Sequence, residues 1–215
     1  MTNGKIAQLI EMDNGLTHSE TIMPAIDRAL EAAGVCAREI DLFAVVAGPG
    51  SFTGVRIGVC AAKGFAHAWG KPCAPIHALE ALSLNLAGFD GLVCPILDAR
   101  RGQVYCAAFD VKTGVPVRAL DDDAVALEDF IGSLPPCEKY AFVGDGVPVN
   151  AEKIKVMLGA RVFLPPAHLL SLRADAVAVL AAQKEDEWVA ARALTPVYLR
   201  KPQAERERME KLNHA

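Results

Sequence analysis

Residues 42–70 constrain the fold of this chain most, because they are typical of a strand, a glycine-rich loop and a helix in immediate succession. Leu42 to Ala47 are all apolar, with no polar residue alternating between them. A strand of that kind is buried on both faces, as in a parallel sheet covered by helices. We therefore expect an α/β protein with this strand in its core.

The loop that follows contains three glycines and two hydroxyl side chains, in the order Gly48, Gly50, Ser51, Thr53 and Gly54. Backbone N–H groups at the start of the next helix have no intrahelical partner, which makes the loop a candidate anion site. Its spacing matches neither the P-loop nor the G-x-G-x-x-G motif. This mismatch favours the alternative, a tight turn whose glycines serve geometry and packing.

Two helices are expected in the first half of the chain. One runs from Thr17 to Ala33, begins with a capping box formed by Thr17 and Glu20, and carries an aliphatic stripe. The other, over Val55 to Trp69, is rich in glycine and alanine, so another helix can approach it closely. His18 and Glu20 have no second histidine or acidic cluster at ligand spacing, and no metal site is predicted.

The composition narrows the functional classes. The chain has 215 residues, 52% of them hydrophobic and 22% charged, which is ordinary for a folded protein. Neither a signal peptide nor a membrane-spanning segment is evident. The six cysteines form no C-x-x-C pair, so we expect free, mostly buried thiols in the cytoplasm. A net charge of −4 argues against independent binding to nucleic acid.

The second half opens with a predicted hairpin of strands at Leu92 to Asp98 and Gln103 to Asp110. Asp98, Arg100 and Arg101 at its turn form the most polar cluster with no obvious structural role. A solvated turn with local ion pairs is one interpretation. The alternative is that these groups face a cleft or a partner, because paired arginines suit phosphate or carboxylate recognition.

The remaining elements are expected at short intervals. His77 is interpreted as a capping or core histidine, Asp121 to Asp123 as an exposed acidic run, and Gly144-Asp145-Gly146 as a tight turn, with adenosine or phosphate contact as the alternative. Strands are predicted at Lys5 to Glu11, Lys71 to Ile76, Tyr140 to Val143 and Arg161 to Leu164, and helices at His77 to Leu86, Leu127 to Ser133, Val149 to Leu158 and from a Ser171 cap towards Gln183.

Several segments together resemble the TsaB (YeaZ) family. They are His18-Ser-Glu-Thr-Ile-Met-Pro, Gly48-Pro-Gly-Ser-Phe-Thr-Gly-Val-Arg-Ile-Gly, Ile76-His-Ala-Leu-Glu-Ala-Leu, Asp98-Ala-Arg-Arg-Gly-Gln-Val-Tyr and Pro196-Val-Tyr-Leu-Arg. The resemblance implies two RNase-H-like lobes of the actin-like ATPase superfamily. We expect the first lobe over residues 1–90, the second over 91–200 and a charged tail over 201–215.

The resemblance also implies a function in making threonylcarbamoyladenosine in ANN-decoding tRNAs. In that family the protein is a non-catalytic partner of TsaD, TsaE joins as an ATPase, and tRNA is held only through the complex. No cofactor is expected for this chain. The family is often called glycoprotease-like, but no metallopeptidase or nucleophile motif is present to support proteolysis.

The resemblance makes the two helices of the first half the expected TsaD-binding surface, and a homodimer is expected when the partner is absent. The candidate contact residues are Ile22, Ile26, Ala29, Leu30, Arg56, Val59, Ala62, Lys63 and Ala66. The main alternative is an ATP-binding actin-like enzyme that uses the loops at Gly48 and Gly144. The remaining alternative is a metallopeptidase.

Members of the family usually begin with two strands, the first carrying an Asp, that have no counterpart here. We therefore expect an incomplete first lobe, with Met1 an internal methionine of a longer reading frame. An in-frame apolar strand with an Asp should be encoded upstream, and a stop codon there would contradict this expectation.

Overall fold

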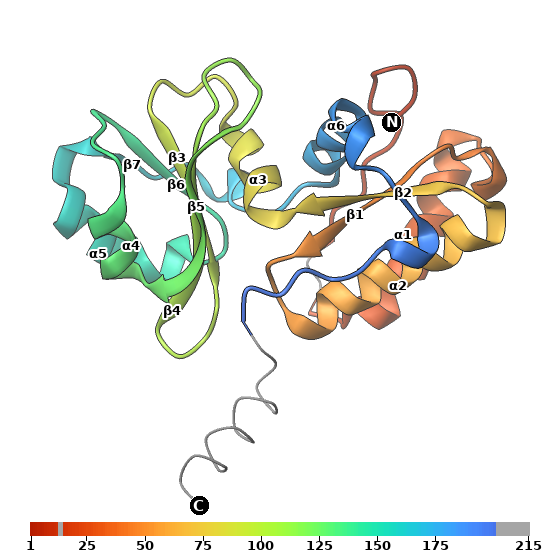
Figure 1. Cartoon of the computed structure of the whole chain (residues 1–215), viewed down its shortest axis with the longest axis horizontal. Helices are drawn as coiled ribbons and strands as arrows, with labels where there is room; N and C mark the ends of the chain where they lie inside the picture. Colours follow the sequence, from red (N-terminus) through yellow and green to blue (C-terminus); the bar gives the residue numbers. More distant parts are fainter. Residues whose placement is uncertain (13–14, 201–215) are drawn as a thin grey trace, which may run out of the picture.

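The computed structural model describes residues 1–12 and 15–200, which form a mixed α/β structure with two separate sheets (Figure 1). The first sheet has the strand order β1-β2-β8 and the second the order β5-β4-β3-β6-β7. The strands are β1 Phe43–Gly48, β2 Pro72–His77, β3 Leu92–Asp98, β4 Gln103–Asp110, β5 Val117–Ala126, β6 Tyr140–Val143, β7 Val162–Phe163 and β8 Val189–Ala190.

Helices cover both faces of the first sheet. The helices of the described residues are α1 His18–Ala33, α2 Phe52–Trp69, α3 Ala78–Ser83, α4 Leu127–Ser133, α5 Val147–Leu158 and α6 Ala174–Gln183, and of these α2 and α6 lie on opposite faces of the first sheet. Phe43 and Val45 of β1 pack into the cluster beneath α2, whereas Ala44 and Val46 pack into the cluster beneath α6. Because both faces of β1 are covered, its sequence shows no polar alternation, as predicted.

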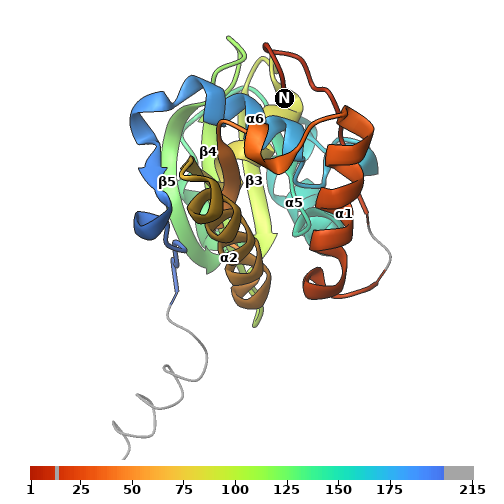
Figure 2. The ribbon, with the colours of Figure 1, turned by 90° about the vertical axis from the view of Figure 1, so that its right-hand side faces the viewer.

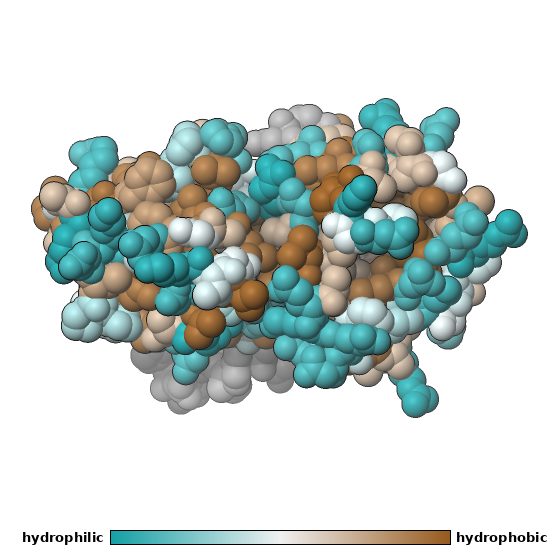
Figure 3. All heavy atoms as spheres, turned by 90° about the horizontal axis from the view of Figure 1, so that it is seen from above, coloured by the Kyte–Doolittle hydropathy of each residue, from teal (hydrophilic) through white to brown (hydrophobic). Residues whose placement is uncertain are grey.

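The second sheet is also enclosed by helices. Leu79 and Leu82 of α3 pack with Phe109 on one face, while Ile154 of α5 and Phe142 belong to the cluster on the other. Every residue of α3 is buried, because this helix lies between the two sheets. Viewed from above, hydrophobic side chains reach the surface in the middle of the molecule, and hydrophilic ones cover much of both ends (Figure 3).

The chain returns to the first sheet after completing the second. β8 pairs antiparallel with β2, and α6 packs on β1 and β2. The Lys184 ammonium, next to the end of α6, lies 2.9 Å from the Glu80 carboxylate of α3. A division of the sequence at residue 90 therefore separates β8 and α6 from the sheet to which they belong.

Two local predictions are wrong, and a third holds only in part. Lys5 to Glu11 forms no strand, because no neighbouring strand within residues 1–12 and 15–200 pairs with it. Ser171 does not cap α6, since its Oγ donates to Glu11 Oε1 at 2.5 Å and the helix begins two residues later than that cap requires, at Ala174. The acidic run is exposed at Asp121 and Asp123, as predicted, but Asp122 is half-buried, and all three residues lie within β5.

Most other elements are confirmed. The capping box of Thr17 and Glu20 begins α1, and Gly34 ends it with a φ of 67°. Both hairpin strands have the predicted bounds. Throughout the described ranges, no helix combines the length and apolar character that crossing a bilayer requires. The predicted charged tail, residues 201–215, lies outside the described residues.

Candidate functional site

Helices α1 and α2 form an outward-facing pair on the first half of the molecule, nearest the viewer in Figure 2. None of residues 18–33, all of which the structure describes, is buried. The aliphatic stripe of α1 stays half-exposed; its members are Ile22, Ile26, Ala29 and Leu30. An amphipathic helix packed mainly on one other helix keeps apolar surface available for a further contact.

The predicted contact residues of α2 divide between the interior and the surface. Val59 and Ala66 are buried in the cluster with Cys73, so they are unavailable to a partner. Lys63 Nζ donates to the Arg192 and Leu194 carbonyl oxygens, both at 3.2 Å, and thereby holds the C-terminal segment. The inclusion of Val59 and Ala66 in a partner surface is corrected on these grounds, because the helix uses this face for its own sheet, whereas the half-buried Lys63 stays a prediction.

The two other predicted residues of α2 lie differently. Ala62 is half-buried against the same cluster. Arg56 is exposed, and its guanidinium carbon lies 5.0 Å from the centroid of the Phe52 ring. On α2, Arg56 is thus the predicted contact residue with the most accessible side chain.

A cleft of about 930 Å³ lies between the two sheets. Two predicted groups that are distant in sequence line it together, and they are Gly50, Ser51, Thr53 and Gly54 from the start of α2 and Asp98, Arg100 and Arg101 from the hairpin turn. The structure therefore brings the glycine loop and the arginine turn to one cavity.

The backbone of the C-terminal segment approaches Gly48 so closely that no side chain fits there. The φ of Gly48 is 132°, and a Cβ at this position would collide with the Val197 carbonyl oxygen. The Val197 N–H donates to the Ala47 carbonyl oxygen at 2.7 Å, which fixes the C-terminal segment across the end of β1. The glycine is required by this close approach, which accords with the tight-turn interpretation.

The turn at Gly144-Asp145-Gly146 also requires glycine because another part of the backbone lies close to it. Gly144 has a φ of 114°, and a Cβ there would collide with the Ile96 carbonyl oxygen. The Gly146 N–H donates to that oxygen at 3.1 Å. Here too the glycines accommodate the chain's own backbone, which lies along β3.

The hairpin turn is shaped by two carboxylates. Asp98 Oδ1 accepts the Arg100 backbone N–H at 2.7 Å, and Asp145 Oδ1 accepts the Asp98 N–H at 2.9 Å. Burial raises the pKa of Asp145 above its usual value. Arg100 and Arg101 both adopt the left-handed conformation, with φ of 64° and 56°. Two consecutive non-glycine residues in this conformation are unusual. The turn places both arginines at the cleft.

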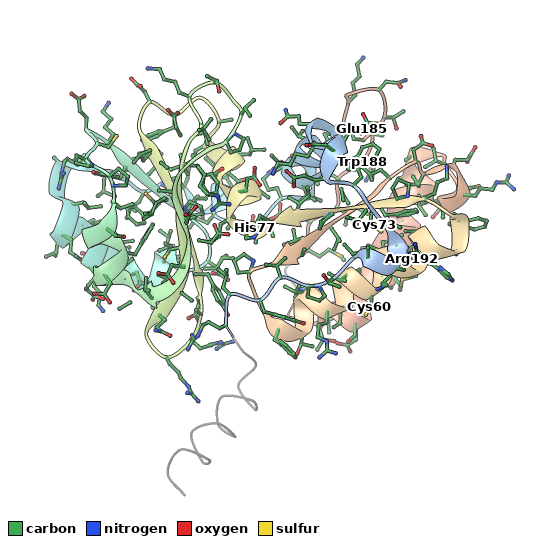
Figure 4. All side chains as sticks on the ribbon, in the orientation of Figure 1. Cys60, Cys73, His77, Glu185, Trp188 and Arg192 are labelled. Carbon is green, nitrogen blue, oxygen red and sulfur yellow. The ribbon has the colours of Figure 1, made fainter. Side chains whose placement is uncertain are left out.

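A charged cluster between the two halves was not predicted. His77 Nδ1 lies 2.9 Å from Asp122 Oδ2, although the ring N–H is not aligned for a hydrogen bond, and Asp122 also pairs with Arg118 (Figure 4 labels His77). Burial opposes ionisation of Asp122, but contacts with His77 and Arg118 outweigh it and hold its pKa below the usual value. No local pattern could reveal a pair 45 residues apart that only the fold unites.

The cysteines offer no metal site. Within the residues that the structure describes, no three His, Cys, Asp or Glu side chains are grouped to hold an ion. Cys73, Cys94 and Cys106 are buried, whereas Cys36 and Cys60 are exposed, so the expected burial holds for half of the thiols. Desolvation raises the pKa of the Cys106 thiol to about 12.

Comparisons with known proteins place the chain in a family. Residues 15–207 match the family model described as TsaD: tRNA N6-adenosine threonylcarbamoyltransferase. The tRNA threonylcarbamoyladenosine biosynthesis protein TsaB of Bacillus subtilis is 35% identical over 189 residues, 87% of this chain and 82% of that protein. The TsaB of Haemophilus influenzae is 39% identical over 92 residues, 41% of this chain and 39% of that protein.

A solved structure agrees with these sequence relatives. YeaZ from Pseudomonas aeruginosa superposes with a TM-score of 0.73 at 26% identity, covering 86% of each chain. The chain belongs to the TsaB (YeaZ) family of tRNA threonylcarbamoyladenosine biosynthesis proteins, within the wider group that the TsaD family model describes.

Proposed function

We propose that this chain is a non-catalytic scaffold that binds and activates TsaD in the threonylcarbamoyladenosine modification of tRNA. The observation that carries the proposal is α1, a 16-residue amphipathic helix without a buried residue. Its half-exposed stripe and the exposed Met23 next to it leave apolar surface that a folded partner would cover.

The sequence similarity between this chain and TsaD favours a helical interface between them. The family model that matches this chain is the TsaD model itself. Two chains of related fold present matching helices, which can pack around an approximate two-fold axis, as identical subunits do. The same surface would support a homodimer of this chain when TsaD is absent.

The proposal extends to the architecture and the complex. The two sheets with their helices would be the RNase-H-like lobes of the actin-like superfamily. TsaE would join as the ATPase, and TsaD would carry the nucleotide and metal chemistry.

Binding of ATP in the cleft is the second candidate, favoured by the meeting of the Ser51 loop with Arg100 and Arg101. The close approach of Val197 to Gly48 weighs against it, because this glycine already accommodates the chain's own backbone. Saturable, magnesium-dependent binding of labelled ATP to the isolated chain at micromolar concentration would support this candidate.

The scaffold is tested by co-purification with TsaD from the same organism, measured by size-exclusion chromatography with light scattering. Met23 is 44% exposed, so Met23→Glu should leave the fold intact while it weakens the heterodimer by about 2 kcal/mol, roughly 30-fold. Ile26→Glu places a charge in the adjacent aliphatic stripe and should weaken the heterodimer as well.

The matched control is Val149→Glu, because Val149 is exposed on α5 of the second half. Circular dichroism of each variant separates a lost contact from a lost fold. Undiminished TsaD binding by both α1 variants would refute this surface.

A further inference from the structure

Two stacked aromatic rings line the cleft. Phe52 begins α2, and Tyr198 lies in the C-terminal segment that crosses β1. Their ring centroids are 5.0 Å apart with an interplanar angle of 29°, and the residues are 38% and 43% exposed. A stacked pair this exposed keeps an aromatic face available to a flat ligand.

Arginines from three segments lie on this pair or line the same cleft. Arg56 lies over the Phe52 ring, and Arg200 donates through Nη1 to the Ala99 carbonyl oxygen at 2.9 Å. A guanidinium has five N–H donors, so this bond leaves most of those of Arg200 for other acceptors. The side chain of Arg100 is 89% exposed.

The neighbouring carboxylates are partly engaged in shaping the hairpin turn. Asp98 and Asp145 accept backbone N–H groups there, and the Asp98 carboxylate lies 3.9 Å from Arg100 Nε. At that distance the ion pair is weak, since an exposed pair contributes less than about 1 kcal/mol. A phosphate group could therefore compete for Arg100.

We propose that this strip, defined as Phe52, Arg56, Arg100, Tyr198 and Arg200, binds a single-stranded segment of the RNA that the complex modifies. Arginines bind phosphates, and exposed aromatic rings stack on bases that a loop leaves unpaired. The inference rests on the proposed function and adds a direct RNA contact on this chain to contacts made by TsaD.

The position of the strip fits this occupant. His18 at the start of α1 and Phe52 at the start of α2 both line the cleft, so the strip adjoins the proposed TsaD surface. An RNA loop lying on the strip would extend towards the partner. The net charge of −4 predicts that the isolated chain binds RNA weakly and that the strip acts within the complex.

The test measures binding of a fluorescently labelled tRNA anticodon stem-loop to the heterodimer with TsaD at several salt concentrations. Tyr198→Ala should weaken binding about tenfold or more, whereas Tyr198→Phe keeps the stacking and should retain it. Arg100→Gln should weaken binding and reduce the salt slope by about one counterion. Arg38→Gln, an exposed arginine outside the cleft, is the control.

Light scattering separates this inference from the scaffold proposal. If Tyr198→Ala and Arg100→Gln form the heterodimer but bind RNA as tightly as the wild type, the RNA inference is refuted and the scaffold stands. Failure of the wild-type chain to bind TsaD would refute the scaffold instead. Displacement of the RNA by ATP alone would reassign the strip to a mononucleotide and overturn the inference.

Discussion

Replacing Gly48 with alanine should destabilise the protein by about 2–4 kcal/mol. A non-glycine residue held at a φ of 132° costs about 1–3 kcal/mol. The new Cβ would also displace the Val197 carbonyl group, which lengthens the hydrogen bond from the Val197 N–H to Ala47 and removes about 1 kcal/mol more. For a chain of this size the sum corresponds to a fall in Tm of about 4–16 °C.

Urea unfolding followed by circular dichroism measures this loss. The matched control is Gly64→Ala, because Gly64 lies within α2 and a Cβ there would meet nothing within 4 Å. That substitution should stabilise the protein by about 0.5–1 kcal/mol. If Gly48→Ala were as stable as the wild type, the assignment of this glycine to the crossing of the C-terminal segment would be refuted.

Two further predictions concern charged and thiol groups. The folded-state pKa of Asp122 is lowered, so its contribution to stability is present above pH 4 or so and is lost as pH falls through the folded value. Asp122→Asn should therefore reduce the loss of unfolding free energy at acid pH, as measured by urea unfolding at a series of pH values. An unchanged dependence on pH would contradict the pairing with His77 and Arg118. Iodoacetamide at pH 8 should label exposed Cys60 readily and Cys106 only after unfolding, as mass spectrometry can check.

Local signals were enough to predict much of the fold. The strands of the hairpin have the predicted bounds because their side chains pack within the second sheet and the turn interrupts them. Thr17 and Gly34 fix the ends of α1, since caps act within a few residues. The continuous apolar run of β1 predicted helices on both faces.

Long-range contacts could not be predicted in the same way. The sequence around Val59 and Ala66 gives no sign of which face of α2 lies on its own sheet, because small residues occur on several faces of that helix. His77 and Asp122 meet only through the fold. Lys5 to Glu11 is a strand by composition, but a strand also needs a neighbour to pair with.

The return of β8 to the first sheet has a consequence for synthesis on the ribosome. All strands of the second sheet lie between residues 92 and 163, so that sheet can form as soon as this stretch has emerged. The first sheet is complete only after Val189 and Ala190 have emerged, and the end of β1 gains its hydrogen bond to the C-terminal segment only after Val197 has emerged. The half that is translated first is therefore completed last, and until then β2 exposes an edge to other nascent chains.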